Sequence, residues 1–152
     1  MRTSLPIFRL CIFAIGLLVA TTTLGATGVE AMQDDTERAR SALRTIEDAI
    51  QQRDVQLLAR SFSSKVYITL FTGENGWYSA EQSYFILRNF FSTHTPLSLS
   101  LTPSGAASGT PYGVGTLLYM SRGRRSSAQI FVSLVRTDSG DFRLNQITVA
   151  SR

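Results

Sequence analysis

The chain has very little of the chemistry expected of a redox or metal-binding protein. Its 152 residues include one cysteine, Cys11, and one histidine, His94. A single cysteine cannot form an internal disulfide, and a lone imidazole without partner ligands does not make a metal site. We therefore expect no disulfide, no bound metal and no cofactor.

A strong excess of one charge is also lacking. The chain has 15 basic and 11 acidic residues, a formal net charge of +4. Removing Arg2, Arg9 and Glu30 with the N-terminal segment discussed next leaves 13 basic and 10 acidic residues, a net charge of +3. This mild excess gives no reason to expect a nucleic-acid partner.

Long apolar runs are absent except at the N-terminus. Arg2 and Arg9 form a positive start, and residues 10–20 are uninterruptedly apolar. This run fits the apolar region of a signal peptide, about 7–15 residues long. It is shorter than the ~20 residues that a membrane-spanning helix needs. The segment therefore predicts export, and the predicted location of the protein is periplasmic or extracellular.

Small residues after the apolar run mark the expected cleavage site. Cleavage after Ala31 puts Val29 and Ala31 at positions −3 and −1, and cleavage after Ala26 is the alternative. We predict a signal peptide over residues 1–31 and one domain over residues 32–152, with no stable membrane span after cleavage. An uncleaved signal anchor is the competing interpretation.

Helical periodicity dominates the start of the predicted domain. The Asp-Asp-Thr sequence at residues 34–36 offers N-caps, and apolar residues between positions 39 and 50 recur at helical spacing. Asp54 is then predicted to cap a short second helix over residues 55–62. The two helices should pack together as a unit.

The next segment predicts a strand, a turn and a long helix. Residues 65–71 alternate with apolar or aromatic side chains on both faces, which predicts a strand covered on both sides. Residues 72–76 should break this strand, and Asn75-Gly76 within them is a strong turn pair. Ser79 and Gln82 stand at the N-cap and N3 positions of a capping box, and the helix that they begin should end before Pro96.

The remainder predicts an antiparallel meander. Four alternating segments follow, at residues 97–101, 112–120, 128–135 and 142–149. In the first of them Leu97, Leu99 and Leu101 are expected on one face, with serines on the other. Helices, one strand, a further helix and then a meander make an α+β arrangement.

The order of these segments carries a family resemblance. Its most informative parts are Gly76-Trp77-Tyr78-Ser79, the capping-box helix, and the segments at residues 97–101, 111–118 and 129–135. From about Ala42 to Val149 the chain resembles a family of small exported bacterial envelope proteins of unknown function with the nuclear transport factor 2-like (cystatin-like) fold. The resemblance implies an α+β cone in which N-terminal helices pack in a curved antiparallel sheet.

A cone of this kind usually has a cavity between the sheet and its long helix, where ligands bind or reactions occur. Catalysis would need a titratable group poised for proton transfer, and no carboxylate falls within a predicted strand. We therefore predict a non-catalytic binding module for an apolar or weakly polar small molecule. The candidate pocket residues are Trp77, Tyr78, Tyr84, His94 and Tyr112. Alternatively, Tyr78 is a hydrophobic staple and His94 a helix cap.

One dense cluster of charge remains, at a predicted hairpin tip. Arg122, Arg124 and Arg125 are candidates for contacts with an anion, and the alternative is a solvated tip. Two other functions stay open. One is a homodimer formed through a semi-polar sheet face, and the other is a small-molecule enzyme that uses His94 with a tyrosine.

Overall fold

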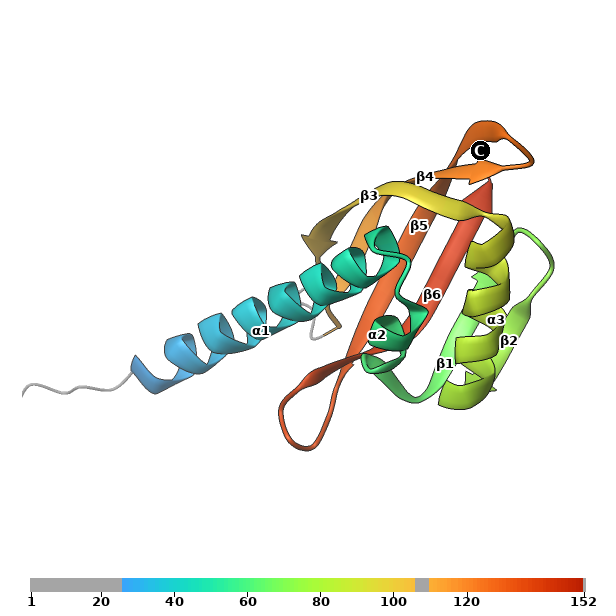
Figure 1. Cartoon of the computed structure of the whole chain (residues 1–152). Coiled ribbons are helices and arrows are strands. Elements are labelled where there is room, and N and C mark those ends of the chain that lie inside the picture. The colour runs from blue at the N-terminus through green and yellow to red at the C-terminus, as the bar shows by residue number, and fades with distance from the viewer. Residues whose placement is uncertain (1–25, 106–109, 152) are drawn as a thin grey trace, which may run out of the picture.

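The structure, a computed structural model, describes residues 26–105 and 110–151, with side chains from Ala31 onward (Figure 1). Most of the predicted signal peptide, residues 1–25, lies outside the described residues. The helices are α1 (Ala26–Gln51), α2 (Val55–Ala59) and α3 (Ala80–Thr93). The strands are β1 (Phe62–Leu70), β2 (Asn75–Ser79), β3 (Thr95–Ser104), β4 (Tyr112–Ser121), β5 (Arg124–Arg136) and β6 (Phe142–Ser151).

The strands form one curved sheet of six, in the order β2-β1-β6-β5-β4-β3 (Figure 1). Strands β3 to β6 make the predicted antiparallel meander. The sheet is mixed, not purely antiparallel, because β1 pairs in parallel with β6. β1 and β6 are the first and last strands along the chain, and the long connection between them allows either a parallel or an antiparallel pairing. The α+β class is confirmed.

The three helices lie on one face of the sheet and enclose the core (Figure 1). From α1, Leu43, Ile46 and Ile50 are buried, as the helical spacing predicts. They pack in the same cluster as the inward-facing side chains of the sheet, such as Ile130 and Ile147. The N-terminal half of α1 projects beyond the sheet (Figure 1).

The predicted start of α1 is wrong. The helix begins at Ala26, so residues 34–36 lie inside it and are not N-caps. Their carboxylates are engaged in ion pairs, Asp34 with Arg38 at 2.6 Å and Asp35 with Arg136 at 3.1 Å. Asp34 lies four positions before Arg38, and an ion pair at this spacing stabilises the interior of a helix. The acidic residues that suggested an N-cap therefore form ion pairs instead.

The second helix is shorter than predicted. The Asp54 carboxylate accepts a hydrogen bond from the backbone N–H of Leu57 at 2.8 Å, which confirms the cap. The helix ends at Ala59, and Phe62, which we predicted to be helical, begins β1 opposite Leu144. Phe62 is nevertheless buried, as expected.

The predicted break over residues 72–76 is confirmed at its start, but strand β2 replaces the turn that we predicted at Asn75-Gly76. Asn75 and Gly76 lie opposite Thr69 and Ile68 of β1, and the chain reverses before them, at residues 71–73. A turn-forming dipeptide therefore begins an edge strand. The strand β1 is also less covered than predicted, because Tyr67 and Thr69 on the face away from the helices are only half-buried.

Helix α3 has the predicted ends, and the strand after it has an unpredicted bulge. Ser79 and Gln82 form the reciprocal capping box, and His94 is the C-cap. The register of β3 shifts between Pro96 and Ser98. This bulge leaves Leu97 40% exposed, so its predicted burial beside Leu99 is wrong.

Candidate functional site

The end of α3 fixes the orientation of His94. Its backbone N–H donates to the carbonyl oxygen of Phe90 at 2.8 Å. Its ring Nδ1 lies 3.2 Å from the same carbonyl and 2.9 Å from Thr93 Oγ1. A carbonyl can only accept, so the tautomer that donates from Nδ1 is favoured. The other ring nitrogen, Nε2, has no partner among the described residues.

Aromatic rings hold the imidazole from three sides. It stacks on Phe90, with ring centroids 4.7 Å apart and planes inclined by 15°. Phe71 meets the imidazole edge-on at 5.1 Å, and Tyr119 at 5.4 Å. Tyr119 comes from the inward face of β4 and is itself buried. The four side chains form an aromatic wall built from α3, β4 and the end of β1.

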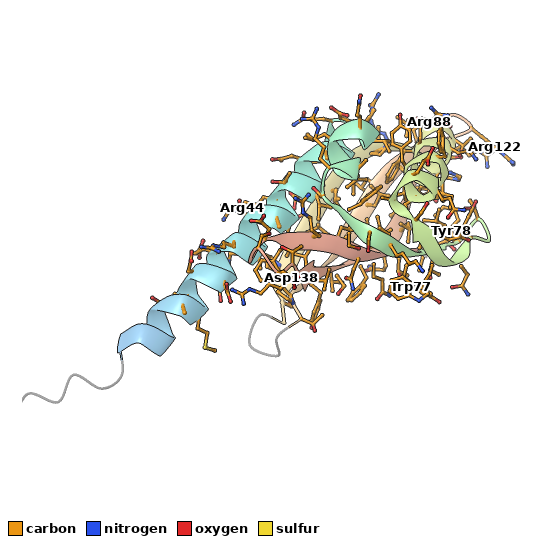
Figure 2. The ribbon with its side chains drawn as sticks, turned by 90° about the horizontal axis from the view of Figure 1, so that it is seen from below. Arg44, Trp77, Tyr78, Arg88, Arg122 and Asp138 are labelled. Atoms are coloured by element: carbon orange, nitrogen blue, oxygen red, sulfur yellow. The ribbon has the colours of Figure 1, made fainter. Side chains whose placement is uncertain are left out.

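The β4–β5 hairpin extends past this wall and carries the arginines. Arg122 and Gly123 have φ values of 49° and 73°, the left-handed pair that a two-residue hairpin connection requires. Ser121 and Arg124 lie opposite each other at the base of the turn, whereas Arg125 pairs with Met120. Because side chains alternate along a strand, Arg124 and Arg125 point to opposite faces of the sheet. Figure 2 shows Arg122 at the end of the molecule remote from the N-terminus of α1.

Between the aromatic wall and the hairpin lies an open hollow of about 990 Å³. It is lined by Thr93, His94, Tyr119, Ser121, Arg122, Arg124 and Ser126. The lining combines two guanidinium groups, an imidazole and several hydroxyls, and it includes no carboxylate. Neither arginine of the lining takes part in an ion pair with the described residues. We call this the hairpin hollow.

The other predicted pocket residues lie elsewhere. Trp77 and Tyr78 point to opposite faces of β2, one 60% exposed and the other half-buried against the core. Tyr84 is half-buried on α3, with the Arg88 guanidinium 5.5 Å from its ring centroid. Tyr112 begins β4 and packs against Phe131 at 5.4 Å. These four residues do not gather into one pocket.

The structure thus brings together His94, Arg122 and Arg124 of the predicted site residues. Tyr119 and Ser121 were not predicted as site residues, although they precede the arginines at alternate positions of one strand. That alternation was the available signal that they share the face of Arg124. Among the described residues, no three histidine, cysteine or acidic side chains cluster as metal ligands would.

Fold and site together define a class: a cystatin-like (nuclear transport factor 2-like) α+β protein with a cationic hollow at its hairpin end. The family is shown by a direct match. Residues 43–150 match the model of the domain of unknown function DUF4783, and the chain belongs to this family.

Solved structures support the same fold. A DUF4783 family protein from Bacteroides uniformis has a TM-score of 0.64 and 14% identity, covering 72% of this chain and 95% of that one. A DUF4783 family protein from Bacteroides fragilis has a TM-score of 0.62 and 18% identity, and the match covers 71% of this chain and 96% of that one. A protein with a cystatin-like fold from Caulobacter vibrioides has a TM-score of 0.61 and 15% identity, and the match covers 78% of this chain and 90% of that one. Among curated proteins, none matches the sequence.

Proposed function

We propose that this protein is an exported, non-catalytic binding module that holds a small anionic molecule in the hairpin hollow. The observation that carries the proposal is the pair of arginines beside the aromatic wall, Arg122 and Arg124, neither of which forms an ion pair with any described residue. A guanidinium group binds carboxylate or phosphate with two parallel hydrogen bonds. The hydroxyls of the lining add further donors.

The residues that line the hairpin hollow suit a different class of ligand from the apolar or weakly polar molecule that the sequence suggested. An apolar ligand within the cone would need space between the sheet and the helices. The side chains there that we describe, such as Leu117 and Ile130, are fully buried within the packed core. In the hairpin hollow, His94 and Tyr119 provide ring surface and the arginines provide charge. A small molecule with both a planar part and an anionic group matches this combination.

The surroundings of the histidine support the proposal of a non-catalytic role. Its Nδ1 lies against the end of its own helix, beside the carbonyl oxygen of Phe90 and the hydroxyl of Thr93, and no carboxylate among the described residues contacts it. The hollow also has no acidic side chain to act as a general base. The two arginines and the hydroxyls of the lining are suited to holding an anion.

The test is calorimetric titration of the domain with benzoate, phenyl phosphate and inorganic phosphate. The double substitution R122Q/R124Q should weaken binding by roughly tenfold or more, because a hydrogen bond to a charged group contributes about 1.5–3 kcal/mol. The matched control is R125Q, which removes the same charge from the opposite face of the hairpin and should change affinity less than twofold. Absence of binding to all three probes, or an equal loss in the control, would disprove the proposal.

A second candidate function is dimerisation through the face of the sheet that points away from the helices. Leu118 is 46% exposed and Val114 is 39% exposed, both on that face of β4. The predicted semi-polar surface surrounds them, with Ser98 and Ser127 opposite Leu118 in the register. Sedimentation velocity at micromolar concentration should then show a dimer that the substitution L118E dissociates. A monomer at all concentrations would remove this candidate.

A further inference from the structure

The face of the sheet that points away from the helices carries an ordered aromatic pair on its β2 side. Trp77 is the only tryptophan of the chain, and its side chain is 60% exposed. It lies directly opposite Tyr67 in the β1–β2 register, and the two rings meet edge-on with centroids 5.2 Å apart. Figure 2 shows Trp77 at the periphery of the molecule, where a ligand can reach its ring.

Hydrogen bonds hold this pair in place. The Tyr67 hydroxyl donates to Asn75 Oδ1 at 2.9 Å, and the Thr69 hydroxyl donates to the same oxygen at 3.2 Å. The Asn75 amide oxygen is therefore occupied, while its NH₂ group has no partner among the described residues. An exposed asparagine with its oxygen bound twice presents its two N–H donors to solvent.

The next strand continues the surface with uncharged polar groups. Gln146 of β6 lies beside Tyr67, and Thr148 lies beside Thr69. Both are half-buried. The platform, as we define it, consists of Tyr67, Thr69, Asn75, Trp77, Gln146 and Thr148. None of these side chains carries a formal charge, and three strands at about 4.8 Å spacing make it roughly 10 Å wide.

Only one class of ligand suits every part of this surface. A charged molecule finds no opposite charge on the platform. A purely apolar partner would cover the amides and hydroxyls without replacing their hydrogen bonds to water, at a cost of about 1–3 kcal/mol for each. A sugar ring presents C–H groups on its face and hydroxyls on its rim. The face packs on an indole, and the hydroxyls both donate to and accept from amides and hydroxyls.

We propose that the platform binds a neutral oligosaccharide, with one sugar ring lying on Trp77 and its hydroxyls bonded to Asn75 and Gln146. This site is independent of the hairpin hollow, because the platform lies on the face of the sheet away from the helices. Tyr67 is a positioning residue that sets the angle of the indole and orients the Asn75 amide.

The single tryptophan makes the test direct, because all indole emission comes from the platform. Titration with cellohexaose, maltohexaose and chitohexaose should give a saturable change in emission for at least one of them. By calorimetry, W77A should then weaken that binding about tenfold or more, as anchoring aromatic residues do. Y67F keeps the ring but leaves Asn75 held by Thr69 alone, and should weaken binding roughly fivefold, the equivalent of one hydrogen bond.

The control is V135A, which removes an exposed apolar side chain of β5 outside the platform. It should leave saccharide affinity unchanged, and circular dichroism of each variant separates lost binding from lost fold. No change in emission with any of the three saccharides at millimolar concentration would overturn the proposal. A change in emission on dilution of the protein alone would also overturn it, because a second copy of the chain would then cover the platform.

Discussion

Gly115 of β4 lies against the backbone of β3. A β-carbon added there would meet the carbonyl oxygen of Ser100 at 1.9 Å and the α-carbon of Leu101 at 3.2 Å. Both contacts are with backbone, so neither neighbour can rotate away, and two strands would have to separate. The space for a side chain is absent where the sheet curves over the core.

We predict that G115A destabilises the fold by about 2–3 kcal/mol, the upper part of the range for overpacking. Urea unfolding followed by circular dichroism measures this difference. The matched control is G76A in β2, whose β-carbon would lie in ordinary contact with the Tyr78 side chain, 3.8 Å from its hydroxyl oxygen and 3.9 Å from its ring. The control should change stability by less than about 1 kcal/mol. Equal stability of the two variants would contradict the prediction.

Single residues were predictable from sequence where their role is local. The Ser79 cap and the His94 position at a helix end depend on a few neighbouring residues, and the structure confirms both. The association of His94 with Arg122 depends on how far the β4–β5 hairpin extends past α3. No local pattern in the sequence specifies that distance, so the hairpin hollow became visible only in the structure.

At the scale of elements, the last turns of α1 protect the open edge of the sheet. Strand β3 ends the sheet on one side, and in the part of the chain that the structure describes no further strand pairs with its outward backbone groups. The Gln51 side chain donates to the carbonyl oxygen of Leu99 at 2.7 Å, and the backbone N–H of Leu101 donates to Glu47 Oε2 at 2.9 Å. These side chains occupy the groups that would otherwise pair with another chain.

We predict that E47A/Q51A lowers the free energy of unfolding by about 2–3 kcal/mol, since two hydrogen bonds to β3 are lost and one involves a charge. It should also increase aggregation on heating, because the freed edge of β3 can then pair with a second molecule. Thermal unfolding monitored together with light scattering measures both effects.

The control for this prediction is E37A on the same helix. Glu37 pairs only with Arg40, at 2.6 Å, in an exposed ion pair. Exposed pairs contribute at most about 1 kcal/mol, so E37A should melt close to the unsubstituted protein without added scattering. If E47A/Q51A behaves like E37A, α1 does not protect the edge.

The sequence predicted which segments form helices or strands better than it predicted which strands pair and in which direction. Alternation identified β3 to β6, because one face of each is buried against the helices. The same alternation occurs in parallel and antiparallel strands, so nothing in the sequence showed that β1 runs parallel to β6. Strand β2 was missed because Asn75-Gly76 is a strong turn signal, and its pairing with β1 prevails over that local preference.

For the whole molecule, the contacts that fold the domain begin well inside α1. Asp35 makes a long-range ion pair with Arg136, and Ala39 is the first buried residue of the described helix. The preceding turns project beyond the sheet (Figure 1). Their removal by cleavage after Ala31 would take away no buried side chain that we describe. The folded domain is therefore compatible with the proposal that the protein is exported and processed.

Among the described residues, no helix has the length and hydropathy to cross a membrane. Expressed with its full N-terminus in a Gram-negative host, the protein should appear in the periplasmic or culture fraction, and mass spectrometry should find Met32 as its first residue. A31F should stop cleavage at this position and shift it to the alternative after Ala26, because the residue before the cut must be small. The purified domain starting at Met32 should melt within about 2 °C of one starting at residue 27, since the turns removed contribute less than about 0.5 kcal/mol of packing. Recovery of the chain in the membrane pellet with Met1 retained would instead support the signal anchor.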